Sequence, residues 1–348
     1  MLMMRKLLLI LLLAALIYSC KKDEHVKSAL FRLVDWKVTE LTMPYPNEIS
    51  DLQFLNEDLG FFVNWDGEII KVTGGGERWE KLASFPDYNL RSVFFMDENI
   101  GFVSGYQDYC EDPLAGRERA ILLKTIDGGK NWEVNHVPFN ILSLQFLDKM
   151  LGYAVIEDWN HNPIWYAAKT LDGGLTWQEM HRSASTIVPS LHFISRNTGF
   201  VVDTGRVYRT DNQGEDWTLI VESGEDYFLS NIYFLDDNIG FVRSYLDLYK
   251  TVDGGASWST LRHPFGWGTP MDFSDELNGL PFGGSAMFTN GSHQLPDSAS
   301  VYSTADGGKN WKETRFPAKI YINQVVYPSA STAYLYGWGT WYKFEKRK

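Results

Sequence analysis

From residue 31 onward the sequence consists of short runs in which apolar and polar residues alternate. An aliphatic-x-aromatic step occurs seven times, at residues 52–54, 93–95, 144–146, 191–193, 232–234, 271–273 and 325–327. Five of these steps are followed by glycine, an aromatic residue and a further apolar residue, with weaker versions at Gly279-Leu280 and Ala333-Tyr334-Leu335. A period of two, interrupted by Gly, Asn and Asp, is typical of β-strands joined by turns. We therefore expect strands throughout and no helix after residue 30.

Six of the units also contain a polar octet that ends in tryptophan. Four copies read TIDGGKNW (125–132), TLDGGLTW (170–177), TVDGGASW (251–258) and TADGGKNW (304–311), and two blurred copies read TDNQGEDW (210–217) and VTGGGERW (72–79). The Asp can accept hydrogen bonds from backbone N–H groups of its own turn, a glycine can adopt a positive φ, and the Trp can bury a large apolar face. The third position is Asn212 in one copy and Gly74 in another, a change that a turn tolerates and a metal site tolerates poorly. The octets are thus predicted to be structural turns, and their structural residues are Asp127, Trp132, Asp172, Trp177, Trp217, Asp253, Trp258, Asp306 and Trp311.

Taken in order, a unit reads as two strands, a third strand that leads into the octet, and a fourth that begins at its Trp. Four short strands in about 40–50 residues are typical of a β-propeller blade. The seventh unit lacks its fourth strand, whereas residues 36–41 resemble a fourth strand that no unit precedes. The sequence therefore predicts an all-β, seven-bladed β-propeller with four-stranded blades, the last of them closed by the N-terminal strand, which removes the free sheet edges.

The N-terminus is typical of a targeting segment rather than of a fold. An unbroken apolar run at 7–17, too short to span a bilayer, follows two basic residues and ends in Ile-Tyr-Ser-Cys20. This ending resembles a bacterial lipobox, which implies cleavage before Cys20 and lipid on its sulfur. We expect a lipoprotein signal peptide over 1–19, a lipidated cysteine and linker over 20–30, and a single propeller over 31–348.

The acyl chains on Cys20 would form a stable membrane anchor, so the predicted location is the bacterial cell envelope. The next residues, Lys-Lys-Asp-Glu at 21–24, resemble a surface-export signal of outer-membrane lipoproteins, and a plain charged linker is the alternative. The chain is expected to be an outer-membrane lipoprotein on either the periplasmic or the exposed side. Cys110 is the only other cysteine, so an intrachain disulfide is not expected when Cys20 carries lipid.

The amino-acid composition limits the kinds of molecule that the chain is expected to bind. The 348 residues are 44% hydrophobic and 15% aromatic, which suits a large core of short strands, and the formal net charge is −12. An acidic surface repels phosphate backbones, so nucleic acid is excluded as a general partner. No cofactor and no metal site is indicated.

The octets resemble the Asp-box or BNR repeat. Together with the glycine-aromatic steps, they make residues 30–346 similar to the photosystem II stability/assembly factor-like family of seven-bladed propellers. This resemblance implies a non-enzymatic assembly scaffold with a protein partner. An arginine-rich patch is the functional feature of that family, and Arg117 and Arg119 are the only tight arginine pair in this acidic chain. Asp boxes also occur in sialidases and xyloglucanases, so the motif by itself indicates a fold rather than a function.

Three of the expected turns between second and third strands are long, at 106–119, 157–165 and 285–300. They are expected to project from the propeller face opposite the octets, and long loops on a rigid scaffold often carry function. Exposed aromatic residues there suit a protein hot spot or stacking on a sugar, whereas packing of Trp159 on Trp165 is the structural alternative. The candidate partner-binding residues are Asp108, Tyr109, Arg117, Arg119, Trp159, His161, Trp165, Arg182, Tyr227 and Trp267.

Two functions from different classes fit these patterns. The first is a membrane-anchored, non-enzymatic binding or assembly scaffold whose loop face meets a protein or glycan partner at the cell envelope. The alternative is a glycoside hydrolase of sialidase or xyloglucanase-like type. A sialidase needs an arginine cluster, whereas Arg91 is the one arginine expected on an inner strand. A xyloglucanase-like site needs two opposed acids, for which residues 108, 111, 112, 157 and 158 are candidates.

Overall fold

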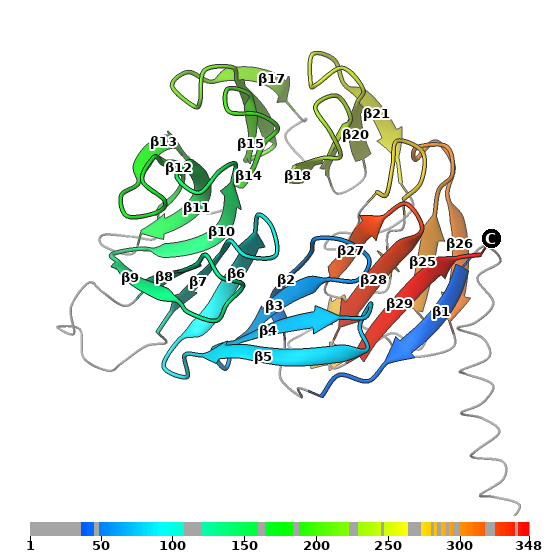
Figure 1. Cartoon of the computed structure of the whole chain (residues 1–348). Helices are drawn as coiled ribbons and strands as arrows, with labels where there is room; N and C mark the ends of the chain where they lie inside the picture. Colours follow the sequence, from blue (N-terminus) through cyan, green and yellow to red (C-terminus); the bar gives the residue numbers. More distant parts are fainter. Residues whose placement is uncertain are drawn as a thin grey trace, which may run out of the picture.

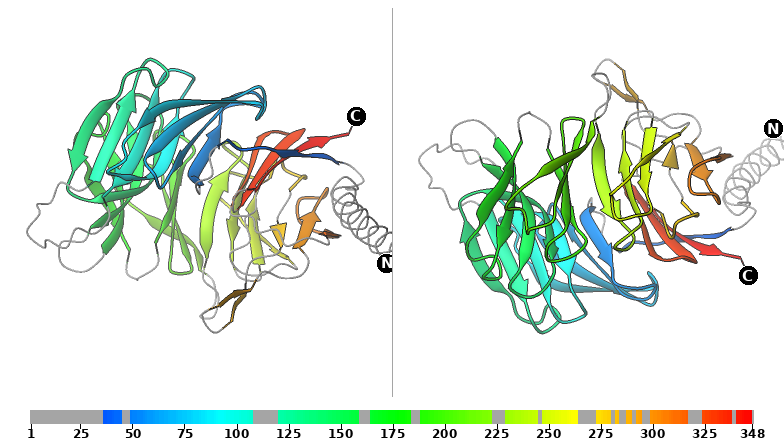
Figure 2. Two further views of the ribbon diagram at one scale, coloured as in Figure 1. Left: turned by 90° about the horizontal axis from the view of Figure 1, so that it is seen from below. Right: turned by 90° about the horizontal axis from the view of Figure 1, so that it is seen from above.

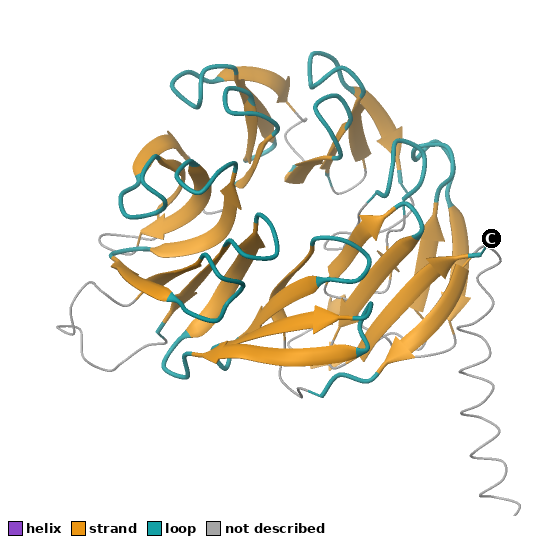
Figure 3. Cartoon of the chain, viewed as in Figure 1, coloured by secondary structure: helices purple, strands orange, loops and turns teal. Residues whose placement is uncertain are grey.

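The computed structural model describes residues 36–44, 49–107, 120–158, 164–183, 188–222, 229–244, 247–263, 273–279, 282–283, 287–289, 292–294, 299–316, 324–337 and 340–347. Within these ranges every regular element is a β-strand, and the strands form antiparallel sheets arranged in a ring (Figures 1 and 3). The all-β propeller class predicted from the alternating pattern is confirmed. The described residues contain no helix long and apolar enough to cross a membrane.

Six sheets have four strands each. In ring order they are blade 1, β2(Ile49–Phe54), β3(Gly60–Asn64), β4(Glu68–Thr73) and β5(Arg78–Ser84); blade 2, β6(Asn89–Phe95), β7(Gly101–Tyr106), β8(Ala120–Thr125) and β9(Glu133–Val137); blade 3, β10(Asn140–Phe146), β11(Gly152–Asp158), β12(Ile164–Thr170) and β13(Gln178–Arg182); blade 4, β14(Ser190–Phe193), β15(Gly199–Asp203), β16(Arg206–Thr210) and β17(Thr218–Glu222); blade 5, β18(Ser230–Phe234), β19(Gly240–Arg243), β20(Asp247–Thr251) and β21(Ser259–Arg262); and the closing blade, β27(Gln324–Ser329), β28(Thr332–Gly337), β29(Thr340–Lys346) and β1(Trp36–Leu41). The first-named strand of each blade lies nearest the centre of the ring (Figure 1).

The prediction of seven four-stranded blades is wrong, because the structure has six. Between blade 5 and the closing blade, β22(Phe282–Gly283), β25(Ala299–Ser303) and β26(Lys312–Phe316) form only a three-stranded sheet, here called the short sheet. Its innermost segment is reduced to single bridges from Gly279 to Phe273 and to Thr304. The sequence repeat continues through this unit, but Pro281 follows Gly279 closely, and a proline cannot donate a ladder hydrogen bond.

A separate hairpin of β23(Met287–Thr289) and β24(Ser292–Gln294) belongs to the same unit. It projects from the ring in both views of Figure 2. It lies within the third of the long segments, at 285–300, that the sequence singled out.

The N-terminal strand completes the closing blade. β1 pairs antiparallel with β29, from Trp36 opposite Lys346 to Leu41 opposite Trp341. The two described ends of the chain therefore lie side by side in one sheet, and this pairing covers the outer edge of β29.

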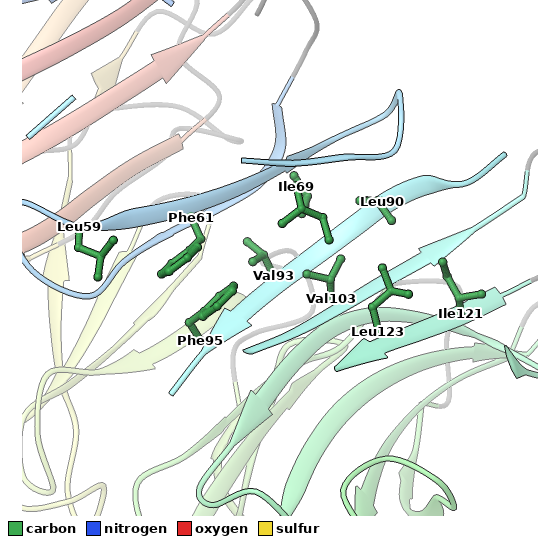
Figure 4. Packing of buried hydrophobic residues seen from close by; sticks show 10 residues of the cluster. Leu59, Phe61, Ile69, Leu90, Val93, Phe95, Val103, Ile121 and Leu123 are labelled. Carbon is green, nitrogen blue, oxygen red and sulfur yellow. The ribbon is translucent and has the colours of Figure 1, made fainter. Parts of the chain in front are cut away.

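The two recurrent sequence steps interlock to form the core. In blade 2, Gly101 lies opposite Phe95, and a Cβ at Gly101 would be 2.5 Å from the Phe95 ring. The aromatic residue after the equivalent glycine of blade 1, Phe61, stacks on that same ring at 3.5 Å between centroids. Figure 4 shows this cluster between blades 1 and 2. The glycine of a blade thus makes room for the inner-strand ring of the same blade. The aromatic residue after the glycine of the preceding blade stacks on that ring and so joins the two blades.

The ring has two faces, named here by their turns. The octet turns lie beside the turns between first and second strands, as when the Gly173 N–H donates to the Met150 carbonyl at 2.9 Å. This end is called the octet face. The opposite end, where second strands turn into third strands and one blade leads to the next, is called the loop face.

Candidate functional site

Each complete octet forms a self-contained hydrogen-bonded turn. In 251–258, the Gly255 N–H donates to Thr251 Oγ1 at 2.8 Å, and Thr251 Oγ1 donates to Asp253 Oδ1 at 2.8 Å. The N–H and hydroxyl of Ser257 donate to the two Asp253 oxygens, and Trp258 Nε1 donates to the Gly255 carbonyl. The Ser257 hydroxyl, followed by its backbone N–H, lowers the pKa of Asp253 to about 2. The carboxylate is thus occupied within its own turn.

The blurred copy at 210–217 makes the same turn with its polar pair exchanged. Asn131 Nδ2 donates to Asp127 Oδ2 at 2.7 Å in one octet, whereas Asn212 Nδ2 donates to Asp216 Oδ2 at 2.9 Å in the blurred one. Asp and Asn have swapped the third and seventh positions, and the hydrogen bond survives with its direction reversed. A turn requires only one donor and one acceptor at these two positions.

A basic residue before the octet threonine joins successive blades, a role that the sequence reasoning missed. Lys169 is buried, and its Nζ contacts the Gln213 carbonyl and Glu215 of blade 4. Arg209 Nη1 donates to the Gly254 carbonyl of blade 5 at 2.7 Å. The signal was present as Lys-Thr or Arg-Thr at the start of octets. These cations on the octet face are bound by neighbouring blades.

Polar residues on the inner strands mostly join one blade to the next. The amide of Gln145 accepts from the Phe193 N–H and donates to the Phe193 carbonyl, at 2.7 and 2.8 Å. Asp51 accepts from the Ser92 hydroxyl and the Val93 N–H, each at 3.0 Å. Burial raises the pKa of Asp51, an effect that these hydrogen bonds oppose. Asp51 is the one acid on the inner strands that the structure describes.

A small hollow of about 190 Å³ lies on inner strands of blades 2 to 4. Ser143, Gln145 and His192 contribute its polar wall, and Phe94 and Tyr153 are among its apolar residues. Burial lowers the pKa of His192 to about 4, so the imidazole is neutral at physiological pH. Within the described ranges no group of three or more His, Cys, Asp and Glu residues is placed to hold a metal ion.

The loop face carries two pairs of arginine and aromatic residues. On blade 3, the Arg182 guanidinium lies 5.7 Å from the Tyr166 ring centre, and its Nε donates to Glu179 at 2.9 Å. Between blades 1 and 2, the Arg91 guanidinium lies 5.5 Å from the Trp65 ring. In such pairs the guanidinium is attracted to the electron-rich face of the ring. The Arg91–Trp65 pair was not among the predicted residues, although Trp65-Asp-Gly is a turn sequence.

Trp165 lies beside the blade 3 pair. It is opposite Glu157 in the β11–β12 ladder and directly precedes Tyr166. Its Nε1 is buried and has no hydrogen-bond partner among the described residues. An unpaired indole N–H is costly to bury. Because this atom is enclosed, what Trp165 offers to a partner is the exposed part of its half-buried ring.

A nearby polar cluster has the residue types of a hydrolase triad but not its connectivity. The Ser183 hydroxyl donates to Asp203 Oδ1 at 2.7 Å, and His181 Nε2 lies 3.4 Å from Asp203 Oδ2. A catalytic histidine must stand between the serine and the acid. Here both residues face the same carboxylate, so the cluster joins blades 3 and 4.

Of the ten predicted partner-binding residues, the structure describes two, Trp165 and Arg182, and brings them to one corner of the loop face. Arg182 is paired directly with Tyr166 in the β12–β13 ladder, and Trp165 is the residue before Tyr166 on β12. The remaining eight lie outside the described residues, as does the predicted lipidation site: Asp108, Tyr109, Arg117, Arg119, Trp159, His161, Tyr227, Trp267 and Cys20.

The chain is similar to known propeller proteins. A family model described as "Photosynthesis system II assembly factor YCF48" matches residues 170–318. No curated protein gives a significant match. Among solved structures, "YCF48 bound to D1 peptide" has a TM-score of 0.63 at 17% identity, covering 90% of this chain and 97% of that one. YCF48 from Cyanidioschyzon merolae has a TM-score of 0.63 at 18% identity, covering 89% and 99%.

Glycoside hydrolases share the fold as well. The GH74 enzyme of Niastella koreensis has a TM-score of 0.65 at 11% identity, and the match covers 86% of this chain and 52% of the enzyme. Only about half of that enzyme is therefore represented. At these identities the likenesses establish the propeller fold, and the chemistry has to be argued from the residues.

Proposed function

We propose that this chain is a non-enzymatic, membrane-anchored scaffold that binds a segment of a partner protein on its loop face. The observation that carries the proposal is the end-to-end likeness to YCF48 propellers, one of which is solved with a bound D1 peptide. The match covers 90% of this chain and 97% of that propeller, so the two share nearly the whole propeller. Peptide capture by one propeller is therefore within the capacity of this architecture.

The loop-face corner of blade 3 suits a polypeptide. Arginine and aromatic residues dominate binding hot spots because they bury much surface with few rotatable bonds. Arg182 is held in place by Glu179 and by the Tyr166 ring, so little entropy is lost when it meets a partner. Trp165 adds the exposed part of a half-buried aromatic ring. The net charge of −12 favours a neutral or basic segment.

The family resemblance does not extend the proposal to photosystem II. The arginine pair Arg117 and Arg119 is isolated in an acidic sequence, whereas the family's functional feature is an arginine-rich patch. The class of partner that we propose is a protein segment of the cell envelope.

Anchoring through Cys20 is the second part of the proposal. The apolar run 7–17 followed by the lipobox-like ending at Cys20 supports an outer-membrane lipoprotein, with the propeller on the periplasmic or exposed side. Replacement of the cysteine, Cys20→Ala, is expected to move the protein from the membrane fraction to the soluble fraction and to abolish incorporation of a labelled fatty acid. Retention in the membrane by the variant would contradict lipid anchoring and leave the loop-face proposal intact.

The loop-face site is tested by cross-linked capture from native membranes with the full-length protein as bait. Trp165→Ala and Arg182→Ala are each expected to reduce recovery of the partner about tenfold, the change that ~1.4 kcal/mol produces. Arg78→Ala is the matched control, because Arg78 is exposed on the octet face. Thermal unfolding must be unchanged in all three. Equal capture by every variant would exclude this corner as the site.

A glycoside hydrolase is the second candidate, supported by the fold likeness to GH74 enzymes. Cleavage needs two carboxyl groups about 5–10 Å apart, and the described inner strands contribute only Asp51, which is engaged by Ser92 and Val93. A reducing-sugar assay on xyloglucan decides between the candidates. Hydrolysis by the wild-type protein that is lost in Asp51→Asn would favour the enzyme, and no hydrolysis is expected under the scaffold proposal.

A further inference from the structure

The middle residue of the aliphatic-x-aromatic step differs from blade to blade. In blade 1 it is Gln53, whose amide accepts from the Phe95 N–H of blade 2 at 2.6 Å and donates to the Phe95 carbonyl at 3.2 Å. Gln145 of blade 3 holds Phe193 of blade 4 in the same way. Where a glutamine stands at this position, it therefore links the inner strands of two neighbouring blades.

Blades 2 and 4 have a different residue there, and neither makes this link. Phe94 has no polar atom in its side chain. The His192 ring is half-buried, stacks on Phe234 of blade 5 at 5.8 Å between centroids, and hydrogen-bonds to no residue that the structure describes. A neutral imidazole has one donor and one acceptor, so both stay available to another molecule.

These middle positions meet at the hollow of about 190 Å³. Phe94, Gln145 and His192 line it from three consecutive blades, and Ser143 lines it from β10. Ser143 is exposed, and its hydroxyl has no hydrogen-bond partner among the described residues. The turn that follows β10 lies on the octet face, so the hollow belongs to the octet-face half of the inner strands. Loss of the glutamine link in blades 2 and 4 thus leaves an aromatic face and free polar atoms around one space.

We propose that this hollow binds a single neutral sugar ring. Hydroxyl, imidazole and amide groups both donate and accept hydrogen bonds, as sugar hydroxyls do, and Gln145 keeps a second amide hydrogen for this purpose. The electron-rich face of Phe94 suits the C–H groups of a sugar. Every lining side chain is uncharged: Phe94, Ser143, Leu144, Gln145, Tyr153, Leu191 and the neutral His192. A charged ligand would lose hydration there without gaining an opposite charge.

The size of the hollow and its lack of acids limit what the sugar can be and what can happen to it. The volume of about 190 Å³ is below the ~300–1,000 Å³ of pockets for drug-sized molecules, so the hollow takes one ring, such as the end of a glycan. Hydrolysis of a glycoside requires two carboxyl groups, and the lining contains none. The site would therefore bind a sugar without cleaving it. It lies away from the loop face, so either proposal can fail without the other.

Saturation-transfer NMR on the full-length protein, in a detergent without a sugar headgroup, tests the proposal. The probes are the methyl glycosides of glucose, galactose, mannose and xylose at neutral pH. We expect transfer to the ring C–H protons of at least one of them and none to methyl glucuronide, which carries a carboxylate. No transfer to any of the four neutral sugars, or equal transfer to the glucuronide, would overturn the proposal.

A variant that restores the repeat locates the binding. His192→Gln places at this position the residue that blades 1 and 3 have, so it can link to Phe234 as Gln145 links to Phe193 and folding should be preserved. Affinity for the sugar is expected to fall about tenfold, the order of one lost hydrogen bond. His136→Gln, on the exposed outer strand β9, is the matched control and should bind as the wild type does.

A second variant tests the aromatic face. Phe94→Leu keeps an apolar side chain but removes the ring on which the sugar would stack, so it should also weaken binding. Thermal unfolding shows whether each variant is folded. Affinity equal to that of the wild type in folded His192→Gln and Phe94→Leu would show that the sugar binds elsewhere and would overturn the assignment to this hollow.

Discussion

The octet turns and the loop-face corner of blade 3 differ in what their side chains leave exposed. On the octet face, the Asp253 carboxylate accepts from its own turn, and Lys250 donates to the Glu276 carbonyl in the next unit. On the loop face of blade 3, Arg182 lies over Tyr166 at an exposed edge, and Trp165 Nε1 has no described partner. The repeated motif is satisfied internally, whereas the non-repeated residues keep binding capacity. Residues that recur from unit to unit therefore have structural roles, whereas the candidate binding residues are ones that depart from the repeat.

The sharpest way to test the structural half of this contrast is to fill a repeated glycine. Gly101→Ala would place a Cβ 2.5 Å from the Phe95 ring, so we expect the free energy of unfolding to fall by ~1–3 kcal/mol through overpacking. Partner capture by the folded protein should be unchanged, because the site lies on another blade. Denaturant unfolding measures the loss.

A second variant identifies the cause of that loss. When Phe95→Leu reduces the ring that the new methyl group meets, the double variant should lose less stability than the sum of the two single variants. Strict additivity would mean that the glycine is required for a reason other than the ring.

The exchanged pair in the fourth octet tests whether the turn needs a particular residue or only a donor and an acceptor. In Asn212→Asp, two carboxylates would meet where Asn212 now donates to Asp216 at 2.9 Å, so the melting temperature at neutral pH should fall. Adding Asp216→Asn recreates the Asp–Asn order of residues 127 and 131 and should restore it. Calorimetry of the three proteins decides the point, and failure of the second change to rescue would mean that the two positions are not interchangeable.

Acid titration offers a smaller test of the same turns. The folded pKa of Asp253 is about 2, below the ordinary value of 3.8. A depressed carboxyl pKa contributes stability that is present above the unfolded value and is lost as the pH falls through the folded value. Between pH 4 and pH 2 the wild-type protein should therefore lose stability more steeply than Asp253→Asn. Parallel curves would indicate that Asp253 has the same pKa when unfolded.

The sequence correctly predicted the strands that recur in this fold, but it did not reveal the unit in which the repeated strands fail to pair. The period-two runs identified the strands. The strand-like run at 36–41 and the missing fourth strand of the seventh unit correctly predicted a sheet made from both ends of the described chain. The number of complete blades was wrong because the aliphatic-x-aromatic step at 271–273 continues the pattern where only a bridge at Phe273 forms. Periodicity reports side-chain alternation, but backbone pairing also depends on partners that are far away in the sequence.

Only part of the candidate site could be predicted from the sequence, for the same reason. Trp165 and Arg182 were selected as loop-face residues. The β12–β13 pairing puts Arg182 directly opposite Tyr166, and Trp165 precedes Tyr166 on β12. The Arg91–Trp65 pair was missed, because it joins an inner strand of blade 2 to a turn of blade 1. Contacts between blades depend on the register of separate sheets, which a single sequence does not contain.

The smallest effect should come from the one octet that lacks its first glycine. Gln213 has a φ of +63°, close to the +67° of Gly254 at the same position of the fifth octet. A side chain in this left-handed region costs ~1–2 kcal/mol, while glycine loses more backbone entropy on folding. Gln213→Gly should therefore stabilise the protein by ~0.5–1 kcal/mol in denaturant unfolding. Because the Gln213 carbonyl, which accepts from Lys169, is retained, the contact between blades should persist. A loss of stability would mean that the Gln213 side chain, through its contact with Asn197, contributes more than the backbone strain costs.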